Sequence, residues 1–202
     1  METKQRIQSR ARELFLKYGI RSISMDDIAT QLGVSKKTIY QYFTDKDGLV
    51  DAIIEEEINH MQQECLDCIQ RSKNAIDEIF LTLRLAIEQF RNMNPAILHD
   101  LQKFHPLSYG HIDKHKRQFL SKVIAANIER GIREDLYRRE VSVDIMSKFH
   151  LESMMLLFDQ EAFPAQQYKL ADLNREVTEH YIYGLATPKG IALIESYKRE
   201  MI

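Results

Sequence analysis

The stretch that decides the fold reads S-M-D-D-I-A-T-Q-L-G-V-S-K-K-T-I-Y-Q-Y-F-T-D-K, from Ser24 to Lys46. It predicts two short helices joined by a tight turn. Ser24 is a good N-cap for the first helix, and Asp27 favours the positive end of that helix. Gly33 suits the turn, because a positive φ is costly for other residues. Ser35 then caps the second helix.

The two short helices each have an apolar side and a polar side. Ile28, Ala29 and Leu32 form the inward stripe of the first helix. Ile39 and Phe43, four residues apart, point inward from the second. The residues left for solvent or a partner are polar, basic or aromatic: Lys36, Lys37, Thr38, Tyr40, Gln41 and Tyr42. A helix-turn-helix places such a second helix in the major groove of DNA.

This segment resembles the DNA-binding signature of the TetR-like (tetracycline-repressor) family of bacterial transcription regulators. The similarity includes A-R-E-L-F-L-K-Y-G-I (11–20), M-D-D-I-A (25–29), L-G-V-S-K-K-T-I-Y-Q-Y-F (32–43) and D-K-D-G-L-V (45–50). The strong match covers residues 7–55, and the rest of the chain agrees only in its helical plan and length. The resemblance implies a sequence-specific DNA-binding transcriptional regulator, most often a repressor.

The remaining chain shows helical periodicity almost throughout and no alternating pattern typical of a strand. Helices are expected at 45–71, 75–93, 95–104, 110–131, 143–160 and 169–186, with a last one from Pro188. The helix at 143–160 carries the apolar residues Ile145, Met146, Phe149, Leu156 and Leu157. We therefore predict an all-α protein: a three-helix head, a long fourth helix and a C-terminal helical bundle. The predicted domains are 1–46 for DNA binding and 47–202 for ligand binding and dimerisation.

Charge is unevenly distributed along the chain, although the net charge of the 202 residues is only −2. Residues 1–46 hold nine Lys or Arg and five Asp or Glu, a net charge of +4, which leaves −6 for the rest. A basic head on an acidic body is typical of a phosphate-binding domain beside a domain that does not meet DNA. An offset of this size also arises by chance, and the motif favours the first interpretation.

Four residues are predicted to contact the phosphate backbone, which positions a protein on DNA. Lys46, near the start of the fourth helix, is a natural phosphate partner. Tyr42 and Thr38 are suitable hydroxyl donors. Ser24 offers a hydroxyl or the free N–H groups of its helix end.

Base contacts are predicted for the outward face of the second helix. Lys36 and Lys37 can donate to guanine, and Gln41 can pair with adenine in a bidentate manner. Tyr40 can meet a base methyl group or the backbone. For Tyr40 and Tyr42 the alternative is a structural role, in which the ring closes the small core of the head.

A homodimer is predicted, because one short helix reads only a few base pairs and specificity needs two heads on a roughly palindromic site. The resemblance implies an interface made by the last two main helices, here 143–160 and 169–186. It also implies that a small molecule bound among the middle helices releases the protein from its operator. The alternative is a DNA-binding protein without small-molecule sensing, which serves an architectural or protein-recruiting role.

The ligand pocket is predicted to be largely apolar and aromatic. Any one of its residues can equally belong to an ordinary helical core. The candidate lining residues are Met61, Cys65, Leu83, Ile87, Leu101, Phe104, Phe119 and Phe149.

No catalytic, metal or cofactor site is predicted. The chain has no phosphate-binding glycine loop, no G-x-S-x-G and no H-E-x-x-H. His111 and His115 can share a metal at i, i+4 spacing, as can Cys65 and Cys68, but neither pair has the spacing of a structural zinc site. Surface or loop histidines and helix-buried thiols are the preferred interpretation. Without a membrane span or a signal peptide, a cytoplasmic location is expected.

Overall fold

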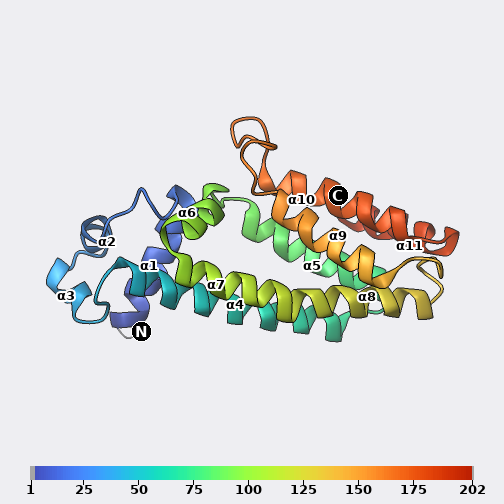
Figure 1. The fold of residues 1–202 in the computed structure, drawn as a ribbon, viewed down its shortest axis with the longest axis horizontal. Coiled ribbons are helices and arrows are strands. Elements are labelled where there is room, and N and C mark those ends of the chain that lie inside the picture. Colours follow the sequence, from blue (N-terminus) through green and yellow to red (C-terminus); the bar gives the residue numbers. More distant parts are fainter. Residues whose placement is uncertain (1–2, 202) are drawn as a thin grey trace. The chain divides into compact units, whose positions relative to one another are not determined.

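The computed structural model describes residues 3–201, and these residues form helices connected by turns and loops (Figure 1). Within them the only β pairing is one isolated antiparallel bridge between Tyr137 and Ala186. The elements are α1 (Thr3–Tyr18), α2 (Met25–Leu32), α3 (Lys36–Tyr40), α4 (Lys46–Arg71), α5 (Ala75–Phe90), α6 (Ala96–Phe104), α7 (Pro106–His115), η1 (Lys116–Leu120), α8 (Ser121–Arg133), α9 (Val143–Leu156), α10 (Leu170–Leu185) and α11 (Pro188–Met201). The all-α prediction is confirmed.

The helices belong to two compact units. The first unit contains the chain up to His60 together with residues 92–114, and the second contains residues 61–91 and the chain from His115 onward. The long helix α4 therefore begins in the first unit and ends in the second. These units differ from the predicted division at residue 46, because α6 and most of α7 pack with the N-terminal helices.

The first unit is built on α1, which packs against α2 and ion-pairs with α4 through Arg12 and Glu57. Its core is formed by fully buried side chains that include Ile7, Ile28, Ile39 and Leu49. Two hydrogen bonds fix the segment around α6 to the end of α1. The Asn94 N–H donates to the Leu16 carbonyl at 2.7 Å, and the Arg21 N–H donates to Asp100 Oδ2 at 3.0 Å.

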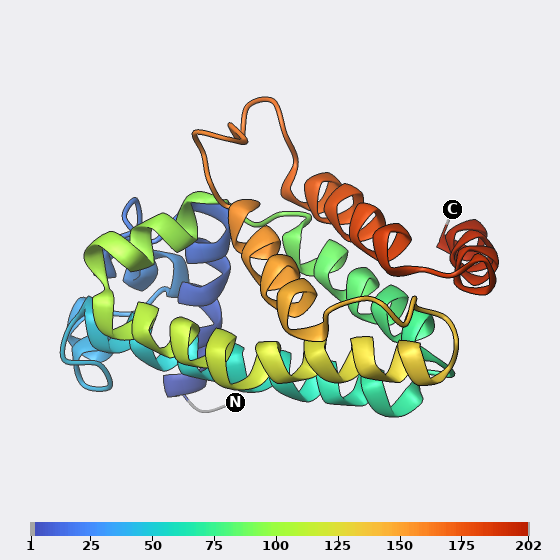
Figure 2. The ribbon, with the colours of Figure 1, turned by 45° about the vertical axis from the view of Figure 1, so that its right-hand side comes forward.

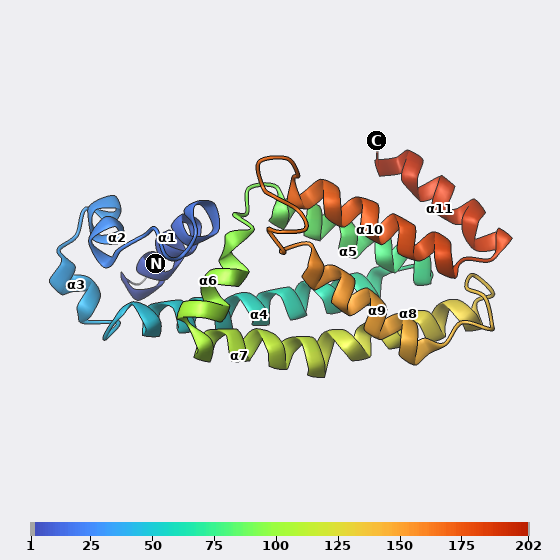
Figure 3. The same cartoon turned by 45° about the horizontal axis from the view of Figure 1, so that its top comes forward.

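In the second unit α5 packs against α8, α10 and α11, and α9 packs against α8 and α10. Figure 2 and Figure 3 show α10 lying along α5 from two directions. The core contains Phe80, Ile128, Tyr137 and Ile182, all almost fully buried. Gly131 on α8 makes room for the Tyr137 ring, because a Cβ atom at this position would lie 2.0 Å from a ring carbon.

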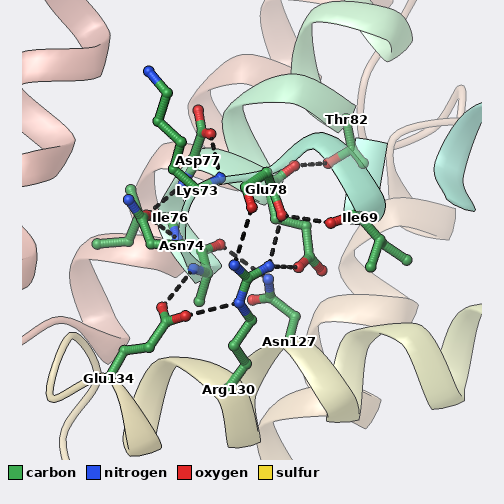
Figure 4. Close-up of polar contacts among 12 residues, drawn as sticks. Ile69, Lys73, Asn74, Ile76, Asp77, Glu78, Thr82, Asn127, Arg130 and Glu134 are labelled. Atoms are coloured by element: carbon green, nitrogen blue, oxygen red, sulfur yellow. Dashed lines mark hydrogen bonds and ion pairs between the residues drawn. The ribbon is translucent and has the colours of Figure 1, made fainter. Parts of the chain in front are cut away.

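A polar network holds α8 to the start of α5 in this unit (Figure 4). The Arg130 guanidinium donates to Glu78 Oε2 at 3.0 Å, to Glu134 Oε1 at 2.8 Å and to Ser72 Oγ at 2.6 Å. Glu134 Oε2 in turn accepts the Ala75 N–H, the first of α5, at 2.8 Å. The network satisfies a buried carboxylate and a helix end that would otherwise lack partners.

Several predicted boundaries need correction. The expected helix at 110–131 begins earlier, at Pro106, and contains a π-helical turn at Lys116–Leu120 before α8. Among the apolar residues noted at 143–160, Leu157 at the end of α9 is buried, whereas Ile145, Phe149 and Leu156 are 63%, 53% and 49% exposed. The side chains that α9 buries are Ser147, His150 and Leu151. Periodicity finds an apolar stripe on a helix but not what covers it.

Candidate nucleic-acid interface

The first helix of the predicted motif, α2, begins with a complete capping box. Ser24 Oγ accepts the Asp27 N–H at 3.1 Å, and Asp27 Oδ2 accepts the Ser24 N–H at 2.8 Å. The pKa of the Asp27 carboxyl is lowered first by the Ser24 hydroxyl, which donates to Asp27 Oδ2, and then by the Ser24 N–H. Gly33 ends the helix with φ +65°, in the left-handed conformation that other residues adopt at a cost. The cap and the turn are both as predicted.

The second helix, α3, is short and begins at a second cap. Ser35 Oγ accepts the Thr38 N–H at 3.1 Å. Ile39 and Phe43 are buried, which confirms the predicted inward pair. The helix ends at Tyr40, but the Gln41 N–H still donates to the Lys37 carbonyl at 3.1 Å. Gln41 therefore follows the last helical residue without a break in the turn.

The side of α3 turned away from the core carries exposed polar and aromatic side chains. Tyr40 and Tyr42 are 43% and 44% exposed, so neither ring closes the core of the head. Lys37 and Gln41 are also exposed. Within the described residues, the side chains of Lys37, Gln41 and Tyr42 make no hydrogen bond inside the protein. They are free to meet a partner.

Lys36 is exposed as well but already has a partner. Its Nζ lies 3.0 Å from Asp26 Oδ2 on α2, and the hydrogen bond to Asp26 raises the pKa of the lysine. The same ammonium lies 5.9 Å from the centre of the Tyr40 ring. An exposed pair of this kind contributes little to stability, so Lys36 can exchange Asp26 for another anion.

Lys46, predicted to bind phosphate, is half-buried at the start of α4. Its Nζ donates to the Ile20 carbonyl at 2.6 Å and lies 5.7 Å from the centre of the Phe15 ring. Burial lowers the pKa of this lysine, and the charges of Asp100 and Asp47 oppose the shift. The ammonium has three donors, so the bond to Ile20 leaves two for a phosphate.

The two predicted hydroxyl donors at helix starts have partners inside the head. Ser24 Oγ lies 2.6 Å from Asp27 Oδ2, to which it donates. Thr38 Oγ1 lies 2.8 Å from Ser35 Oγ. Both hydroxyls stabilise helix ends. The sequence predicted this capping role for Ser24 but not for Thr38.

Comparison with known proteins agrees with this geometry. Residues 7–53 match the family model described as bacterial regulatory proteins, tetR family. The uncharacterized HTH-type transcriptional regulator YvaF of Bacillus subtilis is 24% identical over 165 residues, which cover 81% of this chain and 86% of YvaF. The chain therefore carries a DNA-binding domain of this family in residues 7–53. It is a DNA-binding regulator and not an enzyme.

Solved structures share the TetR fold over nearly the whole chain. A TetR-family regulator from Agrobacterium tumefaciens has a TM-score of 0.76 at 16% identity and covers 91% of this chain and 97% of its own. FadR of Thermus thermophilus, a TetR-family repressor solved in complex with lauroyl-CoA, has a TM-score of 0.57 at 16% identity and covers 91% and 95%. Within residues 3–201 of this chain, no helix is both long and apolar enough to span a membrane.

The predicted pocket residues of this regulator lie in different environments. Leu101 and Phe104 belong to the first unit, and the other six belong to the second. Leu83 and Ile87 are buried, Met61, Cys65 and Phe119 are half-buried, and Phe104 and Phe149 are exposed. A cavity of about 20 Å³ lies in the first unit between α1, α4 and α6, and none of the eight residues lines it. It has room for no more than about one water molecule.

The histidines are more buried than the sequence suggested. His105 and His115 are buried, and Gln62 Nε2 lies 3.0 Å from His115 Nδ1. His150 is buried against Tyr181, with parallel rings 3.9 Å apart. Burial lowers the pKa of His150 to about 4. The expected surface or loop position holds for His105, which lies between α6 and α7, and is wrong for His115, which is buried at the end of α7.

The thiols follow the preferred interpretation more closely. Cys68 is buried, Cys65 is half-buried, and both are free thiols. Burial raises the pKa of Cys65 to about 11, so this thiol stays protonated at neutral pH. A protonated thiol is a weak nucleophile and a weak metal ligand.

Proposed function

We propose that this regulator binds a palindromic operator as a homodimer and represses transcription until a small, largely apolar molecule releases it. The observation that carries the proposal is the outward face of α3. This face presents the exposed side chains of Lys37, Tyr40, Gln41 and Tyr42. The caps at Ser24 and Ser35 fix the starts of α2 and α3 and so hold the face in place. Because the operator lies on the chromosome, the proposed place of action is the cytoplasm.

Different residues are proposed to supply affinity and specificity. Gln41, exposed and without an internal partner, is placed to read a base edge. Lys37 is likewise placed to donate to guanine. Tyr42 and Lys46 are proposed to bind phosphates, together with Ser24 and Thr38 at the helix starts. Lys36 and Tyr40 complete the proposed surface, with Lys36 leaving Asp26 when DNA is bound.

The exposed stripe on α9 supports the homodimer. Ile145, Phe149 and Leu156 are four and seven residues apart, so they share one face of the helix. Three large apolar side chains in a row on one helix are unusual on a monomer and typical of an interaction surface. We propose that this face of α9, with the neighbouring part of α10, meets the same surface of a second copy.

The proposed effector site lies among the apolar residues of the second unit. Leu83 and Ile87 of α5, Met61 and Cys65 of α4, and Phe119 of η1 supply an apolar lining. Thermus thermophilus FadR, which shares the fold, was solved with lauroyl-CoA, and this supports an apolar effector here. Such a ligand acts by favouring a conformation that fits the operator poorly.

Selection of bound sequences from random duplex DNA tests the DNA-binding proposal. We expect an inverted repeat, with each half-site read by one head. Gln41→Ala should relax the preference at one position of each half-site, at a cost of about 1–3 kcal/mol per contact. Lys46→Ala should weaken binding to all sequences and reduce the salt dependence. Lys122→Ala, an exposed lysine on α8, is the matched control and should change neither. Failure to enrich any repeat, with the protein folded and ligand-free, would refute the proposal.

Sedimentation tests the dimer separately. Phe149→Glu places a charge in the middle of the exposed stripe and should convert the dimer to monomers. Lys122→Glu makes a similar change away from the stripe and should leave the dimer intact. If the Phe149→Glu variant is still a dimer, the interface lies on another surface of the protein.

A further inference from the structure

In the first unit, α4 and α7 face each other through acidic and imidazole side chains. On α4 the carboxylates recur every four residues, and on α7 the polar residues recur every three. The facing residues are Asp47, Asp51 and Glu55 on α4, Ser108 and His111 on α7, and His105 directly before α7. None of these six residues belongs to the proposed DNA-binding surface.

We propose that Asp51, Glu55 and His111 bind a divalent transition-metal ion, with Zn²⁺ the best fit. His111 Nε2 lies 3.2 Å from Asp51 Oδ1 and 3.7 Å from Glu55 Oε1. One ligand atom from each of the three residues lies within 4.8 Å of the others. Two ligand atoms at ~2.1 Å from a tetrahedral zinc ion are about 3.4 Å apart. The three side chains are therefore already close to the spacing that one ion requires.

The donor set selects the class of ion. Two carboxylates neutralise the charge of a divalent cation, and an imidazole nitrogen suits Zn²⁺, Fe²⁺, Ni²⁺ or Cu²⁺ better than Mg²⁺ or Ca²⁺. His111 and Asp51 are partly accessible, with 30% and 26% of their side chains exposed, and Glu55 is more open. An ion can therefore enter from solvent, and water can complete its coordination.

A buried hydroxyl supports the geometry of the site. Ser108 is almost fully buried and donates from Oγ to Asp51 Oδ1 at 3.0 Å. Hydrogen bonds of this kind orient metal-ligating carboxylates and are important for affinity. His105, which pairs with Asp47 at 2.7 Å one turn away, lies outside the proposed ligand set. Ser108 is thus a positioning residue and His111 a ligand.

Metal binding by the full chain, measured without DNA, tests the proposal. The protein is stripped with a chelator and then dialysed against buffered Zn²⁺, and bound metal is counted per chain. We expect one Zn²⁺ per chain, with affinity reduced at least tenfold in His111→Ala and in Asp51→Asn. Ser108→Ala should weaken binding by a smaller factor. His99→Ala removes an exposed histidine from α6 in the same unit and should leave binding unchanged.

Co²⁺ as a second probe separates this site from the thiols. Its spectrum should show nitrogen and oxygen ligation without the intense thiolate bands that Cys65 or Cys68 would produce. If no variant binds less metal than the wild type, or if thiolate bands dominate, the proposed site is wrong. If the wild type binds no Zn²⁺, the proposed site is wrong, and the three residues form only a polar contact between α4 and α7. Circular dichroism confirms that each variant keeps its helices.

Discussion

Replacing Arg130 by methionine would remove the centre of the network that joins α8 to the start of α5 (Figure 4). Methionine keeps most of the apolar stem of the side chain and deletes the charged group. The Glu78 carboxylate, whose side chain is only 6% exposed, then loses its ion-pair partner. Ser72 loses the donor to its hydroxyl and to its carbonyl.

The expected loss of unfolding free energy is about 3 kcal/mol. Removing one partner of a buried ion pair costs roughly 3–5 kcal/mol, because the other charge stays buried and unpaired. The lower end applies here, since the Arg130 side chain is 25% exposed and water can reach part of the gap. For a chain of about this size, 1 kcal/mol corresponds to about 2–4 °C in Tm, so we expect Tm to fall by roughly 6–12 °C.

Urea unfolding followed by circular dichroism measures this loss. Arg133→Met, an exposed arginine three residues further along α8, is the matched control and should change stability by less than about 0.5 kcal/mol. In the double variant Arg130→Met/Glu78→Met both charges are gone, and most of the lost stability should return. A loss below about 1 kcal/mol in Arg130→Met, or a double variant no more stable than the single one, would refute the reasoning.

Three further perturbations have defined outcomes. Because the pKa of His150 is lowered from 6.5 to about 4, the unfolded chain takes up its proton first, so unfolding free energy should fall by up to about 3 kcal/mol from pH 6.5 to pH 4. His150→Phe should flatten that profile in urea titrations. Gly131→Ala should prevent folding or cost several kcal/mol by clashing with Tyr137, as thermal melts would show. Asp26→Asn should free Lys36 and tighten operator binding in fluorescence titrations, most clearly at low salt.

The head could be predicted from the sequence because its determinants are local. The Ser24 capping box, the left-handed Gly33 and the inward pair Ile39 and Phe43 each depend on residues within four positions of one another. Helix capping and i, i+4 spacing act over that range. Pro188 also marked a helix start correctly, as the first residue of α11.

The remaining features depend on residues that are distant in the sequence. Lys46 meets a carbonyl 26 residues earlier, and no spacing rule identifies that partner. His111 was considered as a metal ligand with His115 along one helix, whereas the structure brings it to Asp51 and Glu55 of α4. The Ile145 stripe of α9 shows the same limit, because periodicity cannot distinguish a surface covered within the subunit from one covered by a partner.

The hydrogen bonds inside the head determine how much each residue contributes to the free energy of DNA binding. Lys36, Ser24 and Thr38 already bond to groups within the head, so contact with phosphate exchanges one hydrogen bond for another. Such exchanges give only a small net gain. Lys37 and Gln41 have no internal bond to give up, so their contacts add more fully to the binding free energy. Affinity should therefore depend on a few exposed side chains and on the counterions released from DNA. Lys36, Ser24 and Thr38 mainly hold the surface in the shape that the groove requires.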